Sequence, residues 1–251
     1  MLPISIQLYS LREQAKEDFV GVLKRIAEIG YKGVEPAGFW DLTPQEFRKI
    51  VEDLGMQISS THSPWARPDN LNEVIDTLGI LGVKYVAAGY GQNEFKDLDA
   101  IKQTAETLEK MNETLSAAGI TMTLHNHWWE FETIDGRLKY DILAELAPNI
   151  KFELDTYWAA NFGANDSAEI VKRYADRCPL YHIKDGPFVK DEKLLPVGSG
   201  KMNIPAVIQA VDENVTQWLV VEQDNSATDM FECVASSYKY LTENGLAAGN
   251  R

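Results

Sequence analysis

The sequence predicts an α/β protein built as a single closed (β/α)8 barrel domain over residues 1–251. Three observations carry this prediction: short β-rich runs alternate with helical patterns, eight such runs are present, and no linker, charge run or low-complexity segment divides the chain. Alternating strands and helices indicate a parallel sheet, and eight units are typical of a closed barrel. An open, doubly wound sheet is the alternative, but no glycine-rich nucleotide loop follows the first strand.

Eight short segments are the predicted strands. The first is ISIQLYS, the next four follow Gly30, Gly55, Gly82 and Gly119, and the last three are IKFELD, LYHIKD and WLVVEQD. Each of the four glycines ends a helical pattern, because glycine tolerates the left-handed conformation found at helix C-caps. The sequence therefore repeats one punctuation, in which a helix ends at glycine and a strand begins.

The helices between these strands carry their own signals. DFVGVLKRIAEI and EVIDTLGIL place apolar residues three and four apart. In TPQEFRKIVEDLG, Thr43 can cap the helix, Pro44 suits its first turn and Glu46 completes a capping box. Later helices are predicted in YDILAEL, SAEIVKRYA, IPAVIQAV and MFECVASSYKYL.

Composition restricts the partners and the compartment. Lys plus Arg number 24 and Asp plus Glu 38, so the formal net charge is −14, which disfavours nucleic acid and anionic membranes as partners. Cys178 and Cys233 are too few for a disulfide scaffold and are expected to be reduced thiols. With no basic leader and no apolar run of about 18 residues, we expect a cytoplasmic protein. The oligomeric state stays open, a homo-oligomer being one alternative.

Polar residues concentrate where the predicted strands end. In a parallel barrel, all strand C-termini face one mouth, which is where active sites lie. All the histidines map to this mouth, and so do three carboxylates that follow apolar residues: His62, His125, His127 and His182, with Glu35, Asp155 and Glu222. Taken singly, each is most simply a hydrogen-bonded structural group. Together, crowded carboxylates would repel one another unless a cation compensates, so the set predicts a bound divalent metal.

Strand parity orients these side chains, since residues two apart share a face. Thr123, His125 and His127 therefore point into the barrel and Leu124 points outward. The same rule pairs Glu153 with Asp155 and His182 with Lys184. Glu130 lies beyond the strand, where the chain can fold back over the mouth.

Tryptophans also follow the strands. Trp40, Trp65, Trp128 and Trp158 all fall in loops after predicted strands. Packing at the loop bases is one explanation, and an aromatic rim for the C–H faces of a carbohydrate is the other. We expect the rim.

Five motifs in order, LHNHWWEF, FELDTYW, YHIKD, VGSGKMNIP and VVEQD, resemble the sugar phosphate isomerase/epimerase family of the xylose-isomerase-like TIM barrel superfamily. The resemblance covers essentially the whole chain. Its motifs are specific for the superfamily and not for the substrate, because related barrels include ketose epimerases, isomerases, inosose and dehydroshikimate dehydratases and a DNA-repair endonuclease.

The resemblance implies one divalent ion, manganese, cobalt or magnesium, with zinc as an alternative. Asp155, His182 and Glu222 match three of the family's ligand positions. Ketose epimerases have a glutamate at the end of strand five, where this chain has His125; Glu130 could instead reach back to the ion. We prefer Glu130 as the fourth ligand, because a carboxylate neutralises the ion better.

The family implies proton removal from the carbon beside a metal-bound carbonyl or hydroxyl of a sugar or keto-sugar. Glu222, Glu130 and His127 are the candidate catalytic residues. Contacts with the substrate are expected from Glu35, His62, His125, Trp158 and Lys184, although Trp158 stands near the place where epimerases carry a substrate-binding histidine. Without an arginine cluster, an unphosphorylated small-molecule substrate is favoured.

Isomerisation or epimerisation is our first expectation. A lyase that eliminates from a keto-sugar or keto-glycoside with the same metal site is the alternative. The net charge of −14 disfavours a repair endonuclease. A carbohydrate-binding barrel without turnover is the alternative of another class, and metal content would distinguish it from an enzyme.

Overall fold

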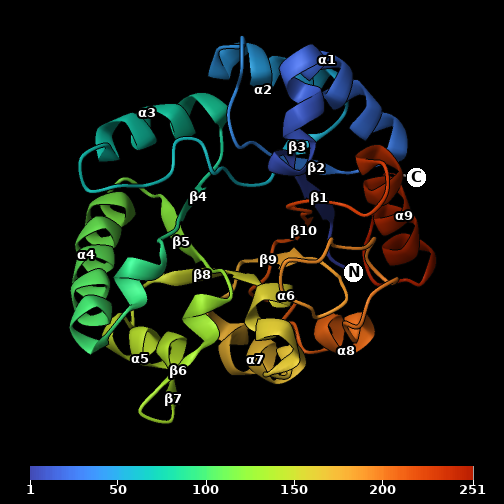
Figure 1. Cartoon of the computed structure of the whole chain (residues 1–251). Helices are drawn as coiled ribbons and strands as arrows, with labels where there is room; N and C mark the ends of the chain where they lie inside the picture. The colour runs from blue at the N-terminus through green and yellow to red at the C-terminus, as the bar shows by residue number, and fades with distance from the viewer. Residues whose placement is uncertain (251) are drawn as a thin grey trace.

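The computed structural model describes residues 1–250 and confirms the predicted α/β barrel, with eight parallel strands surrounded by helices (Figure 1). Each strand coincides with one of the eight predicted segments. The barrel strands are β1 Ile4–Gln7, β2 Gly33–Glu35, β3 Gln57–Ile58, β4 Tyr85–Ala88, β5 Thr121–His125, β8 Lys151–Asp155, β9 Leu180–Ile183 and β10 Trp218–Val221.

The strands close into a near-barrel. Their order is β3-β2-β1-β10-β9-β8-β5-β4, so the first and last strands of the chain are neighbours, with Ile4 opposite Leu219. The remaining gap, between β3 and β4, is bridged beyond the end of β3. There the Thr61 amide donates to the Tyr85 carbonyl at 3.1 Å, and the Ala87 amide donates to the Thr61 carbonyl at 3.0 Å. The open-sheet alternative is thereby excluded.

The helices form the outer layer, and their ends follow the predicted signals. They are α1 Arg12–Ile29, α2 Pro44–Asp53, α3 Leu71–Leu81, α4 Leu98–Ala117, α5 Lys139–Leu146, α6 Thr156–Ala159, α7 Ser167–Tyr174, α8 Ile204–Gln209 and α9 Met230–Glu243. Thr43 and Glu46 form the predicted capping box of α2. Gly30 and Gly82 cap α1 and α3 with φ of 116° and 73°, which glycine adopts without steric cost.

Two short features are additions that the sequence patterns did not reveal. After β5, the chain forms the 3₁₀ turn η3, Trp129–Phe131, and a small hairpin of β6 Thr133–Ile134 and β7 Arg137–Leu138. After β8, it turns at once into the single-turn helix α6. Both insertions lie at the carboxyl end of the barrel, so they shape the mouth.

Side-chain alternation along the strands separates the apolar layer between sheet and helices from a polar barrel interior. On β5 and β8, Leu124, Phe152 and Leu154 are fully buried in the hydrophobic core between sheet and helices. Each such side chain contributes about 1.5–3 kcal/mol on burial, which is enough to fix the facing of its strand. The alternate residues, His125, Glu153 and Asp155 among them, must then point inside the barrel.

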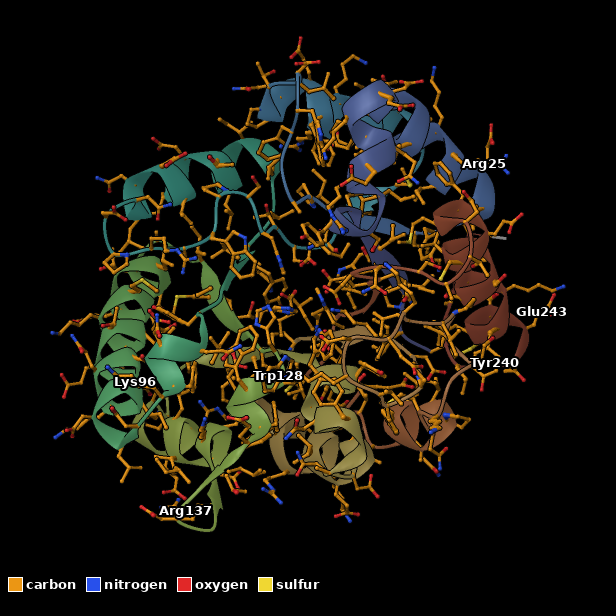
Figure 2. The ribbon with its side chains drawn as sticks, viewed as in Figure 1. Arg25, Lys96, Trp128, Arg137, Tyr240 and Glu243 are labelled. Atoms are coloured by element: carbon orange, nitrogen blue, oxygen red, sulfur yellow. The ribbon has the colours of Figure 1, made fainter. Side chains whose placement is uncertain are left out.

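The outer surface and the thiols complete the fold. Figure 2, viewed as in Figure 1, shows Arg25, Arg137 and Glu243 projecting from the periphery, whereas Trp128 lies inside the ring of helices. Cys178 and Cys233 are buried and free, as expected for reduced thiols. Among residues 1–250, no helix is both long and apolar enough to cross a bilayer.

Candidate active site

The four histidines converge at the carboxyl end of the barrel. The ring centroids of His125 and His182 lie 4.6 Å apart, and His62 lies 5.1 Å from His125 and 5.3 Å from His182. His127 lies 5.3 Å from His125. Asn126, between His125 and His127 in the sequence, bonds through its side chain to the backbone of β8. Its side chain accepts from the Asp155 amide at 2.9 Å and donates to the Asp155 carbonyl at 3.2 Å, which ties β5 to β8.

His182 divides the cluster into two sides. Its Nδ1 lies 2.7 Å from Glu222 Oε2, and its Nε2 lies 2.9 Å from Glu35 Oε2. We call the surroundings of these atoms the Nδ1 side (Asp155, Glu222, Asp224 and Lys184) and the Nε2 side (Glu35, Glu153 and His62). Burial would lower the pKa of His182, but Glu153, Glu222 and Glu35 hold it well above its ordinary value. Without a metal, this imidazole is therefore a cation between carboxylates.

Hydrogen bonds engage most of the carboxylate oxygens on the Nε2 side, with Glu153 Oε1 the exception. Glu35 is fully buried and accepts from Gln7 Nε2 and from Ser60 Oγ, both at 2.6 Å. Glu153 Oε2 lies 2.5 Å from His62 Nε2. Burial and the neighbouring Glu153 raise the pKa of Glu35. Burial also acts to raise the pKa of Glu153, but His62 and His182 hold it well below its ordinary range.

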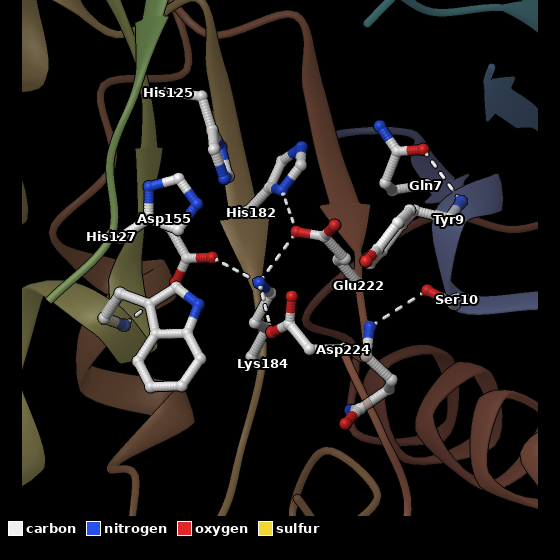
Figure 3. Close-up of polar contacts among 12 residues, drawn as sticks. Gln7, Tyr9, Ser10, His125, His127, Asp155, His182, Lys184, Glu222 and Asp224 are labelled. Atoms are coloured by element: carbon white, nitrogen blue, oxygen red, sulfur yellow. Dashed lines mark hydrogen bonds and ion pairs between the residues drawn. The ribbon is translucent and has the colours of Figure 1, made fainter. Parts of the chain in front are cut away.

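The Nδ1 side is built around a buried ammonium group, as Figure 3 shows. Lys184 Nζ lies 2.8 Å from Asp155 Oδ2, 2.7 Å from Glu222 Oε2 and 2.9 Å from Asp224 Oδ2. The lysine is 0% exposed, and its Nζ lies 5.5 Å from the centroid of the Trp158 ring. Burial would lower the pKa of Lys184, but the three carboxylates hold it well above its ordinary value.

The two ligand carboxylates of this side differ. Burial acts to raise the pKa of Glu222, yet Lys184 and His182 hold it well below its usual range. The pKa of Asp155 is raised because burial outweighs the attraction of Lys184 and His182. Asp155 Oδ1 accepts from the Trp158 amide at 2.9 Å, whereas Oδ2 makes no hydrogen bond.

The donor atoms fit a divalent cation. Two groups of residues, sharing His125 and His182, each bring four potential ligand atoms within 4.8 Å of one another: His62, His125, Glu153 and His182, and His125, Asp155, His182 and Glu222. In the second group, His125 Nδ1 and Asp155 Oδ2 make no hydrogen bond. Burial and the charge of His182 lower the pKa of His125 well below its ordinary value, so this imidazole is neutral and can act as a ligand.

Glu130 lies outside both groups. Its Oε2 accepts from the His127 backbone amide at 2.9 Å, and its Oε1 lies 3.8 Å from His127 Nδ1. The 3₁₀ turn η3 holds this carboxylate under the loop, fully buried. Between the two alternatives for strand five, the geometry favours His125 as the metal ligand and places Glu130 behind His127.

A cavity of about 360 Å³ borders the cluster, with Glu222 and Asp224 of the Nδ1 side and His62 of the Nε2 side in its wall. Its wall contains three of the four histidines, two carboxylates and one tryptophan: Tyr9, Ala37, His62, Trp65, His125, His127, Glu222 and Asp224. The expected rim of four tryptophans is wrong in that form, because Trp65 alone among them borders this cavity. Trp40 packs against Phe19 with ring centroids 4.5 Å apart, and Trp128 packs against its neighbour Trp129.

The expected site residues are therefore divided by depth. His62, His125, His127 and Glu222 line the cavity, whereas Glu35, Asp155, His182 and Lys184 lie fully buried beneath it. Trp158 covers Lys184 without lining the cavity. The expected contacts of Glu35, Trp158 and Lys184 with a substrate stay predictions.

Two polar residues of the site received no role from the sequence. The period-two alternation placed Glu153 on the face of Asp155 without giving it a role, and the same alternation, continued from Glu222, could have found Asp224. Gln7, whose side chain donates to Glu35, carries no comparable signal in the sequence.

The GSGK segment has a structural explanation. The Asp185 carboxylate accepts from the backbone amides of Gly198, Gly200 and Met202 at 2.9–3.0 Å. A Cβ on Gly200 would lie 2.1 Å from Asp185 Oδ1, which explains the glycine. This loop therefore binds a carboxylate of the chain itself.

Known proteins resemble this chain over its whole length. An inosose dehydratase of Clostridium perfringens is 22% identical over 287 residues, covering 96% of this chain and 95% of that protein. A sugar phosphate isomerase/epimerase from Parabacteroides distasonis has a similar structure, with a TM-score of 0.81, 24% identity, and coverage of 98% and 96% of the two chains. The IOLI protein with a bound zinc atom has a TM-score of 0.71 at 17% identity, with coverage of 97% and 96%.

A family model also matches most of the chain. Residues 23–241 match the family described as Xylose isomerase-like TIM barrel. The matched segment begins within α1, ends within α9 and includes all the histidines and every carboxylate of the Nδ1 and Nε2 sides. The chain therefore belongs to the Xylose isomerase-like TIM barrel family.

Proposed function

We propose that this protein is a divalent-metal-dependent enzyme that removes a proton from the carbon beside a carbonyl or hydroxyl of an unphosphorylated sugar or keto-sugar, as the first step of isomerisation or epimerisation. One observation carries the proposal: the potential ligand atoms of His125, Asp155, His182 and Glu222 lie within 4.8 Å of one another beneath an accessible cavity. A buried set of two imidazoles and two carboxylates suits a divalent ion.

We assign the four ligands to these residues, with His125 in place of Glu130. The neutral imidazole and free Nδ1 of His125 support this choice, as does the engagement of Glu130 by His127. Two imidazole donors favour manganese, cobalt or zinc over magnesium, which prefers oxygen ligands. When bound, the ion would polarise a substrate oxygen and stabilise the negative charge that develops on it.

Two residues of the cavity wall are suited to moving the proton. Glu222 lines the cavity, where an ionised carboxylate can accept a proton from carbon. The His127 ring is stacked on Trp129 with centroids 4.2 Å apart and is backed by Glu130, so its orientation is fixed. We assign His127 to proton transfer at the substrate, and Glu130 to positioning His127.

The cavity wall also supports the choice of substrate class. It contains no Arg or Lys among the described residues, and Glu222 and Asp224 would repel a phosphate. Lys184, beneath the wall, is already paired with three carboxylates. The indole of Trp65, tilted against His62 at 4.4 Å, offers an apolar face to the C–H groups of a sugar.

Dehydration is the second candidate reaction, and the similarity to inosose dehydratases over nearly the full length favours it. The first step, proton removal beside a carbonyl, would be the same. A group on the cavity wall would then protonate the departing hydroxyl, and His127 is the available imidazole. The two reactions differ in product, because elimination yields an unsaturated ketone and isomerisation does not.

The experiment is solvent-deuterium incorporation. Purified protein loaded with Mn²⁺ is incubated in D₂O with a panel of ketoses and inososes. The sugars are then freed of metal, and NMR detects deuterium exchange while ultraviolet absorbance detects an unsaturated ketone. We expect deuterium at the carbon next to the carbonyl, and a chelator should abolish the exchange. Binding of a sugar by the metal-loaded protein without any exchange or elimination would instead support a carbohydrate-binding barrel.

Metal analysis of two variants tests the fourth ligand. His125→Ala should empty the site, because the variant lacks one of four ligand atoms, whereas Glu130→Gln should leave it filled. An empty site in Glu130→Gln with a filled site in His125→Ala would restore Glu130 as the ligand. A filled site in both variants would show that neither residue binds the ion.

A further inference from the structure

Lys184 contacts carboxylate oxygens of two of the four proposed metal ligands. Its Nζ lies 2.8 Å from Asp155 Oδ2 and 2.7 Å from Glu222 Oε2, which belong to two of the four proposed ligands (Figure 3). We infer that Lys184 is an internal cation that neutralises the empty metal site and is displaced toward Asp224 when the divalent ion binds. This inference rests on the proposed function, since it presumes that a metal binds there.

On Asp155, the oxygen more open to a metal is the one that Lys184 contacts. Asp155 Oδ1 accepts from the Trp158 amide, so Oδ2 is its one oxygen without a hydrogen bond, and the lysine ammonium lies against it. Glu222 Oε2 is shared between Lys184 and His182 Nδ1, both at 2.7 Å. Metal–oxygen bonds are roughly 2.0–2.2 Å long. A metal on these oxygens would therefore lie directly against the ammonium group.

Electrostatic repulsion also disfavours the presence of both cations on these carboxylates. A divalent cation and an ammonium group in contact repel strongly, since two unit charges about 4 Å apart already interact by several RT at the effective dielectric constant of a protein. In the metal-free protein, by contrast, the ammonium stabilises carboxylates that are otherwise costly to bury. The ammonium group and the divalent ion thus compete for the same carboxylates, and binding of one disfavours binding of the other.

Asp224 provides the position to which the ammonium moves. Its Oδ2 lies 2.9 Å from Lys184 Nζ, its side chain is 31% exposed, and it belongs to neither group of potential ligands. Asp224 also lines the cavity, unlike Lys184. An ammonium that keeps Asp224 and releases Asp155 and Glu222 moves toward the cavity. Lys184 would then reach a substrate oxygen in the metal-loaded protein only, which makes metal binding a precondition for this substrate contact.

Calorimetric titration with Mn²⁺ alone tests the competition. The variants are Lys184→Met, which keeps an unbranched side chain one atom shorter and without charge, and the control Lys190→Met, which removes an exposed lysine lying over Trp128 at 4.6 Å. Removing the competitor should tighten Mn²⁺ binding at least about tenfold in Lys184→Met. The control should change it by less than about twofold, because exposed charges are screened.

The outcomes separate the two proposals. If wild type and Lys190→Met bind no divalent ion, the proposed function fails. If both bind Mn²⁺ but folded Lys184→Met binds it equally or more weakly, only the displacement of Lys184 is wrong, and the lysine organises the site instead.

A structure of the wild-type protein with Zn²⁺ decides the matter if Lys184→Met does not fold. The expected result is that Nζ has left Asp155 Oδ2 and Glu222 Oε2 while it keeps Asp224. An ion bound to His125, Asp155, His182 and Glu222 with Nζ still in contact with both oxygens would overturn the inference.

Discussion

The two sides of His182 carry similar residues and are built for different tasks. On the Nε2 side, Glu35 and Glu153 are wholly buried, and donors from Gln7, Ser60 and His62 engage them. On the Nδ1 side, Glu222 and Asp224 line the cavity, and Asp155 Oδ2 makes no hydrogen bond. Each side thus keeps one buried carboxylate oxygen without a hydrogen bond, Glu153 Oε1 and Asp155 Oδ2, but only the Nδ1 side adds carboxylates on the cavity wall and a lysine ammonium.

Depth along the strands explains the difference. Glu153 and Asp155 share a face of β8, two residues apart, which is about 7 Å along the strand. Both are fully buried and neither lines the cavity, but Asp155 is the last residue of the strand and lies against Lys184, whereas Glu153 lies deeper, against His62. Glu35 ends the short strand β2 but folds inward under His182, so it belongs with the deeper residue. The comparison predicts that the Nδ1 side binds metal and substrate, and that the Nε2 side holds His182 in place.

The largest effect should come from a substitution on the Nδ1 side. Asp155→Ala should weaken metal binding by more than about 100-fold, beyond the 10–100-fold typical of outer-shell changes, because it removes a ligand oxygen. Metal content after dialysis is the measurement, and Asp99→Ala, which changes an exposed carboxylate on α4, is the matched control. Retention of the metal by folded Asp155→Ala would assign the site elsewhere.

The next effect should be on rate, without loss of metal. His127→Asn should slow single-turnover deuterium exchange by about 10²–10⁴-fold, because it removes an imidazole that transfers protons. Metal content should stay at the wild-type level, since His127 is in neither ligand group. Trp129→Phe keeps an aromatic ring beneath His127 and should exchange much faster than His127→Asn. Equal rates in wild type and His127→Asn would remove this residue from the mechanism.

A smaller effect on metal affinity is expected from a substitution on the Nε2 side. Glu35→Gln keeps the shape of the side chain but weakens its bond to His182 Nε2, so metal affinity should fall about 10–100-fold. Titration with Mn²⁺ is the measurement, and Glu28→Gln, which is exposed on α1, is the control. A loss as large as that of Asp155→Ala would break the comparison, because it would make Glu35 a ligand. No loss would show that His182 needs no orientation from this side.

The smallest effect concerns the cavity wall. A sugar that binds there should change tryptophan fluorescence, and Trp65→Phe should remove most of that change while altering sugar affinity by less than about tenfold, because an aromatic ring remains. Trp40→Phe should leave the signal intact, since Trp40 packs against Phe19 instead of the cavity. A signal lost in Trp40→Phe and kept in Trp65→Phe would place the sugar elsewhere.

The barrel was predictable because its signals are local. Glycines at helix ends, the Thr43 capping box and the period-two alternation each act within a few residues, so they identify strands and facings without knowledge of their neighbours. The parallel arrangement then brings every strand end to one mouth, which is why the histidines converge as expected. The sequence by itself therefore determined the architecture and the end of the barrel where chemistry occurs.

The assignment of partners depended on tertiary structure. His125 and Glu130 are both plausible strand-five ligands in the sequence; the turn η3, which folds Glu130 back under His127, separates them. Lys184, which follows β9, contacts carboxylates from β8 and from the end of β10, the strands on either side of its own. Glu35 reaches His182 across the barrel. Such contacts depend on strand stagger and loop direction, which are set by packing over the whole barrel. Local patterns carry no information about either, so only the folded structure decided which polar groups meet.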